Sequence, residues 1–93
     1  MIGLKEAMEI AKNFIVEMNG EQENFQLEEI TLSNDKKNWE VTYSYNKKIA
    51  NPNQLQVALG FKAYRAYKRI VIDGETNEVV GMYNWAYENR EVA

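Results

Sequence analysis

The spacing of apolar residues predicts that the protein begins with a helix. Between residues 2 and 18, apolar side chains recur every three or four positions, as they do along one helix face. These residues are Leu4, Ala7, Met8, Ala11, Phe14, Ile15 and Met18. Asn19-Gly20 should end the helix, because both residues tolerate the left-handed backbone of a helix C-terminus. So short a helix is marginal alone in water, and its apolar face must pack on another element.

After Gly20 the pattern changes to the period of two that is typical of half-buried strands. We predict a first strand over 25–32, in which Glu28-Glu29 interrupts the alternation and forms a bulge. Residues 33–38 are polar and read as a turn. The second strand, over 39–45, has the clearest alternation in the sequence, with Trp39, Val41, Tyr43 and Tyr45 on one face.

The remaining segments predict a loop and then a hairpin. Asn51-Pro52-Asn53 cannot continue a central strand, so residues 46–60 are predicted to form a loop with a short helix over 54–59. Strands are predicted over 61–73 and 79–87, joined by a turn over 73–78. In that turn, the carboxylate of Asp73 should accept hydrogen bonds from backbone N–H groups.

These elements give one α+β domain over residues 1–93, in which an N-terminal helix packs on a four-stranded antiparallel sheet in the order α-β-β-(short helix)-β-β. The expected core is the apolar helix face together with Trp39, Val41, Tyr43, Ile70 and Ile72. The register of the last strand is open at this point. Either its odd-numbered residues from Val79 to Trp85 face the helix, or Val80, Met82 and Ala86 do, and a shift of one residue exchanges the two sets.

Composition removes several classes of function. The sequence has neither cysteine nor histidine, which excludes disulfides, thiol nucleophiles and the commonest metal ligand and general base. No cofactor or metal is expected.

The formal net charge of −3, with basic residues spread along the sequence, argues against nucleic-acid binding. No apolar run reaches the roughly 18 residues of a membrane span. Without an apolar leader we expect a cytoplasmic protein, or an extracytoplasmic one if the protein is trimmed from a longer precursor.

An enzyme is the least favoured class. Adjacent Glu28 and Glu29 should point to opposite faces of a strand unless a bulge intervenes, whereas a general acid–base pair needs both carboxylates at one bond. No phosphate loop and no pairing of a nucleophile with a base can be assembled from these residues. We therefore expect a noncatalytic protein.

Three segments resemble the PepSY family of small domains. Residues 7–11 (AMEIA) resemble the first helix of that family, 39–43 (WEVTY) its central strand, and 70–80 (IVIDGETNEVV) its closing hairpin, with Asn77 in place of the usual turn glycine. The resemblance implies a helix-on-sheet domain without catalytic residues, of the kind found in protease propeptides and cell-envelope proteins, where it binds or inhibits. The partner expected from it is a protein, such as a protease or another enzyme. The cystatin-like fold is a neighbouring alternative, although residues 54–58 (QLQVA) only superficially resemble its inhibitory loop.

The candidate binding residues are Arg65, Tyr67 and Arg69 on the third strand. Arg65 and Arg69 should share one face of that strand, and Lys68 should lie on the other. The six tyrosines and two tryptophans exceed what one helix can cover. They either enlarge the core or form an interface rich in Tyr, Trp and Arg on the uncovered sheet face. The leading hypothesis is a protein-binding or inhibitory module that uses this face. The alternatives are a homodimeric structural domain and a binder of a small apolar ligand between helix and sheet.

Overall fold

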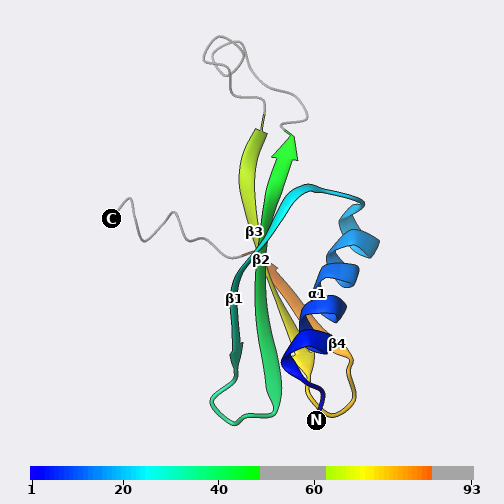
Figure 1. Cartoon of the computed structure of the whole chain (residues 1–93), viewed down its shortest axis with the longest axis vertical. Coiled ribbons are helices and arrows are strands. Elements are labelled where there is room, and N and C mark those ends of the chain that lie inside the picture. The colour runs from blue at the N-terminus through cyan, green and yellow to red at the C-terminus, as the bar shows by residue number, and fades with distance from the viewer. Residues whose placement is uncertain (49–62, 85–93) are drawn as a thin grey trace, which may run out of the picture.

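The computed structural model describes residues 1–48 and 63–84, which form one helix and a single sheet. The elements are α1 (Leu4–Asn19), β1 (Glu23–Leu32), β2 (Asn38–Lys48), β3 (Ala63–Asp73) and β4 (Val79–Asn84). The sheet is an antiparallel meander in the order β1-β2-β3-β4, and α1 lies across one face of it (Figure 1). The predicted α+β architecture, with one helix on a four-stranded antiparallel sheet, is thereby confirmed. The short helix predicted over 54–59 lies outside the described residues.

The C-terminus of α1 is where the Asn19-Gly20 pair predicts it. Gly20 has a φ of 81° and donates its backbone N–H to the carbonyl of Val16 at 2.7 Å. A positive φ costs glycine little because it has no Cβ. The backbone then turns into β1, so this residue both closes the last helical turn and redirects the polypeptide toward the sheet.

The buried face of α1 consists of Ala7, Ala11 and Ile15, which are fully enclosed. The two alanines let the helix approach the sheet closely, and Ile15 supplies the bulk. Leu4 and Met18 were predicted for the same face but are 48% and 61% exposed. That part of the prediction is wrong because both residues lie in the terminal turns of α1, at the ends of its contact with the sheet.

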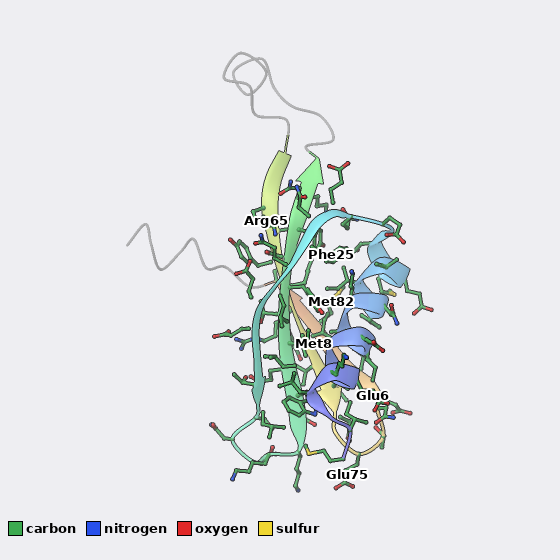
Figure 2. The ribbon with its side chains drawn as sticks, in the orientation of Figure 1. Glu6, Met8, Phe25, Arg65, Glu75 and Met82 are labelled. Atoms are coloured by element: carbon green, nitrogen blue, oxygen red, sulfur yellow. The ribbon has the colours of Figure 1, made fainter. Side chains whose placement is uncertain are left out.

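The sheet contributes Val41, Tyr43, Tyr45, Ile70 and Ile72 to the core, facing α1. The ring of Phe25, from β1, lies 5.2 Å from the ring of Tyr45 and meets Tyr43 edge-on at 6.0 Å. Figure 2 shows Phe25 and Met8 on the helix side of the sheet. The predicted core residues of β2 and β3 are buried, apart from Trp39, which is half-buried against the core.

Two aromatic side chains also tie the helical segment to β2 by hydrogen bonds. The indole Nε1 of Trp39 donates to the carbonyl of Ile2 at 3.1 Å, and the hydroxyl of Tyr43 donates to the carbonyl of Met8 at 3.2 Å. Burial raises the pKa of the Tyr43 hydroxyl, and the nearby Glu9 raises this pKa further. The hydroxyl therefore stays protonated and acts as a donor at neutral pH.

The predicted bulge in β1 is present. Leu27 pairs with Tyr43 and Glu29 with Thr42, so Glu28 is the additional residue between the two pairs. Strand β1 has a second irregularity near Asn24, which has a φ of 57°. Bulges shift the alternation of side chains and hinder further pairing at a sheet edge.

β2 is longer than predicted and runs to Lys48, so Asn46 belongs to the strand and not to a loop.

The hairpin between β3 and β4 follows the predicted turn chemistry. Oδ1 of Asp73 accepts hydrogen bonds from the backbone N–H groups of Glu75 at 2.8 Å and Thr76 at 3.1 Å. These hydrogen bonds lower the pKa of the Asp73 carboxyl. Asn77 has a φ of 66°, the conformation for which a glycine is usual.

A bulge settles the register that the sequence left open. Val71 pairs with Gly81 and Ile72 with Val79, so Val80 is the additional residue and lies 57% exposed. Both Val79 and Met82 pack against the core as a result, although they belong to different sets in the two alternatives.

Within the described residues, no helix is both long and apolar enough to cross a membrane.

Candidate functional site

The face of the sheet turned away from α1 is called the open face here. No described element covers it (Figure 1). Its side chains include Glu28, Glu29, Glu40, Thr42, Ser44, Asn46, Arg65, Tyr67, Arg69 and Tyr83. The two faces of the sheet differ in chemistry, because the face under α1 is aromatic and aliphatic while the open face carries arginines, carboxylates and hydroxyls.

The three predicted binding residues lie together on the open face. Arg65, Tyr67 and Arg69 alternate along β3 and pair across to Asn46, Ser44 and Thr42 of β2. Figure 2 shows Arg65 on the side of the sheet opposite Phe25. β3 is an inner strand, so its basic residues lie on a sheet face and do not protect a sheet edge.

Lys68 points to the helix side, as its position in the alternation predicts. It pairs with Tyr43 on β2 and donates a hydrogen bond to Oδ1 of Asn84 on β4. Partial burial lowers the pKa of the Lys68 amine, and the nearby Lys47 lowers it further. Lys68 is therefore separate from the arginine cluster.

Arg69 is held by groups from two other strands. Its Nη2 lies 3.2 Å from Oε1 of Glu29 on β1, and its Nη1 lies 3.8 Å from Oε1 of Glu40 on β2. Its Nε also donates to the hydroxyl of the buried Thr42 at 3.4 Å. Ion pairs this exposed contribute at most about 1 kcal/mol each. Their main effect is to neutralise the Arg69 guanidinium and to fix its orientation.

Arg65 is held differently. Its Nε donates to the hydroxyl of Ser44 at 3.1 Å and its Nη1 to Oδ1 of Asn46 at 2.9 Å. Ser44 is fully buried and donates its own proton to the carboxylate of Glu28. Glu28 therefore reaches Arg65 only through the Ser44 hydroxyl, and the described residues place no carboxylate within ion-pair distance of Arg65.

One nitrogen of Arg65 lacks an acceptor. Nη2 is buried and has no hydrogen-bond partner among the residues that the structure describes. Leaving a buried donor unsatisfied costs about 1–3 kcal/mol, and more when the donor is charged. Such groups are rare in folded proteins and call for an explanation. The two arginines described on the open face therefore differ. The charge of Arg69 is neutralised by carboxylates, whereas Arg65 has a nitrogen that can still donate a hydrogen bond.

The aromatic part of the open face comes from Tyr67 and Tyr83. Tyr83 pairs with Arg69 and is 56% exposed. Its ring lies over Gly81, where an added Cβ would come within 2.6 Å of the Tyr83 hydroxyl. A flat, rigid ring next to arginines is the composition of protein interface hot spots. Tyr43 and Tyr45 are buried under α1, so the described tyrosines lie on both faces of the sheet.

The bulge brings Glu28 and Glu29 to the same face, which is the exception expected where a bulge intervenes. Each carboxylate already has a partner, Ser44 for Glu28 and Arg69 for Glu29. In the described part of the protein, no three acidic side chains gather as a metal site requires. Both carboxylates are thus engaged in contacts between strands, Glu28 with Ser44 and Glu29 with Arg69.

The space between α1 and the sheet was the third candidate site, for a small apolar ligand. Ile15, Tyr45 and Ile70 occupy it with no exposed surface, and Phe25 closes the side near β1. Lys12 places its Nζ 5.3 Å from the centre of the Phe25 ring. These contacts make the helix–sheet interface a packed core, so they give the ligand hypothesis no support.

The sequence pattern alone did not identify Ser44, Asn46, Glu28 or Tyr83 as members of the site. The alternation of β2 places Ser44 and Asn46 on the face away from Val41, which is a usable signal. Their contact with Arg65 depends on strand register, and so does the proximity of Tyr83 to Arg69. The bulges at Glu28 in β1 and at Val80 in β4 shift the pairing of these strands, and the sequence does not specify where such shifts occur.

The resemblance to PepSY and cystatin-like domains stays a prediction, because comparison with known proteins gave no match that tests it. The protein matched no family model, no curated protein and no solved structure. The candidate site therefore rests on the geometry of the open face.

Proposed function

We propose that this domain is a noncatalytic module that binds, and in doing so can inhibit, another protein through the open face of its sheet. The observation that carries this proposal is the composition of that face. It combines an exposed tyrosine ring with two oriented arginines over a network that spans β1, β2 and β3. Polar networks of this kind favour specific recognition, and aromatic and arginine side chains supply most interface energy.

The rigidity of the open face supports the same function. Arg65 and Arg69 are each fixed by hydrogen bonds to hydroxyl groups of the central strand β2. A side chain that is already ordered loses less conformational entropy when a partner binds. The face is thus organised in advance for contact with a partner. The carboxylates near it are engaged in the same network, which favours binding over catalysis.

The proposal predicts that Tyr67→Ala combined with Arg69→Ala weakens every complex of this protein by at least about tenfold, since two hot-spot side chains are removed together. Proteins captured on the immobilised domain are purified, and their affinities for wild type and variant are measured by calorimetry. Lys5→Ala combined with Glu6→Ala, on the exposed side of α1, is the matched control and should leave affinity unchanged. Equal affinity of wild type and the β3 variant for every purified partner would exclude the open face as the binding site.

A homodimer through the same face is the second candidate, because the open face carries both arginines and carboxylates and could pair with a copy of itself. Sedimentation of the purified domain distinguishes the two candidates. A monomer at tens of micromolar favours a different protein as the partner, and a dimer that Tyr67→Ala with Arg69→Ala dissociates favours the homodimer.

A further inference from the structure

We propose that the partner presents a carboxylate, which docks on the guanidinium of Arg65 while an apolar group beside it packs on the ring of Tyr67. This inference rests on the proposed binding function and specifies the chemistry of the partner. The carboxylate belongs either to an aspartate or glutamate side chain or to the free C-terminus of a polypeptide.

Arg65 and Arg69 differ in the charge of their partners. Arg69 has the carboxylates of Glu29 and Glu40 within ion-pair distance. Arg65 has only neutral acceptors, the hydroxyl of Ser44 and the amide oxygen Oδ1 of Asn46. Among the described residues, the Arg65 guanidinium therefore has no direct counter-charge, and a carboxylate from a partner would provide one.

The Nη2 nitrogen of Arg65 is unsatisfied in the described residues. A guanidinium has five N–H donors in one plane. The two hydrogen bonds of Arg65 use Nε and Nη1, and they leave Nη2 without an acceptor in the described residues. The two oxygens of a carboxylate match this planar geometry better than any neutral group does. Because Nη2 is buried, the acceptor reaches it only when neighbouring side chains shift, and such changes of rotamer are common at interfaces.

An aromatic ring and several carboxylates share the open face with Arg65. Tyr67 lies two residues further along the same face, whereas Tyr83 pairs with Arg69, four residues away, and its ring lies over Gly81. An apolar side chain next to the carboxylate would contact the ring of Tyr67. Glu28, Glu29 and Glu40 on the same face would repel a continuous phosphate backbone, so a single carboxylate on a protein suits this surface better than a nucleic acid does.

The test selects short random peptides by display on the wild-type domain. We expect the selected sequences to share an acidic residue or a free C-terminus next to an apolar residue. Synthetic copies are then made with the acidic side chain replaced by its amide, and separately with an amidated C-terminus. Whichever replacement removes the docking carboxylate should weaken binding to wild type about 10- to 100-fold, the range for a hydrogen-bonded charge pair.

A double-mutant cycle assigns that loss to Arg65. On Arg65→Gln the acid and amide peptides should bind equally weakly, whereas Lys5→Gln, which removes a charge from the far side of the domain, should retain the full preference for the acid. Arg65→Lys keeps the charge without the planar guanidinium and should lose part of the preference. This variant also replaces Arg65→Gln if the latter fails to fold.

The remaining outcomes separate the two proposals. If the acid and amide peptides bind wild type equally while Tyr67→Ala with Arg69→Ala still weakens both, the carboxylate inference is wrong and the proposed function stands. If selection yields no peptide, or only peptides that ignore every open-face variant, both fail. Binding of a single-stranded oligonucleotide in preference to acidic peptides would overturn the inference in favour of a phosphate ligand.

Discussion

Replacing Ile15 by alanine should lower the free energy of unfolding by about 2–5 kcal/mol, the range for truncating a fully buried isoleucine. Ile15 is the one large side chain on the fully buried face of α1, and it has no exposed surface. Its neighbours on that face, Ala7 and Ala11, are too small to fill the resulting cavity. For a domain of this size, such a loss is a large part of the total stability. Urea denaturation followed by circular dichroism measures it.

Met18→Ala is the matched control because Met18 belongs to the same apolar sequence pattern but is 61% exposed. It should change the free energy of unfolding by no more than about 0.5 kcal/mol. Equal costs for the two substitutions would show that α1 does not pack on the sheet through Ile15 as described.

Gly74→Ala should destabilise the domain by about 1–3 kcal/mol, the usual cost of forcing additional volume into a packed site. A Cβ at this position would lie 2.6 Å from Cε of Met1 and 2.8 Å from the backbone carbonyl of Lys37. The methionine can move, but the Lys37 carbonyl accepts the backbone N–H of Gly74 itself at 2.8 Å. The carbonyl of Gly74 in turn accepts the N–H of Ile2 at 2.9 Å. One substitution thus disturbs the N-terminal segment and both turns at that end of the sheet.

Gly3→Ala is the control for Gly74→Ala. Gly3 precedes α1, and an added Cβ there meets nothing within 4 Å. Alanine is a poorer residue than glycine before a helix, so a cost of less than about 1 kcal/mol is expected. Thermal unfolding of both variants compares the two positions. A cost at Gly74 no greater than that at Gly3 would mean that the contact with Lys37 is not a tight one.

Much of the fold was predictable because it depends on local chemistry. The change of period after Gly20, the turn chemistry of Asp73 and the positive φ of Asn77 each act within a few residues, and the structure contains all three. The register of β4 was not predictable. It depends on a bulge at Val80 that lets Val79 and Met82 face the core together. Gly81 is compatible with a bulge in this strand, but it does not determine which residue is the additional one.

The candidate site was predictable only in outline. The alternation along β3 places Arg65 and Arg69 on one face, and the structure shows them there. The sequence did not indicate that Arg69 has charged partners while Arg65 has neutral ones, because these partners come from β1 and β2. Glu29 reaches Arg69 only through the bulge at Glu28, and Ser44 stands between Glu28 and Arg65. Such contacts between strands are set by register and not by local sequence.

The central claim is that the open face of the sheet is the binding surface. Its most direct test is a nuclear magnetic resonance titration of the isotope-labelled domain with a purified partner obtained by capture. We expect the signals that shift to come from the open face, including the side chain of Arg65 and the residues around Tyr67 and Tyr83. Signals from the exposed side of α1, such as those of Lys5 and Glu6, should stay in place. Shifts centred on α1, with the open-face signals unchanged, would contradict the account.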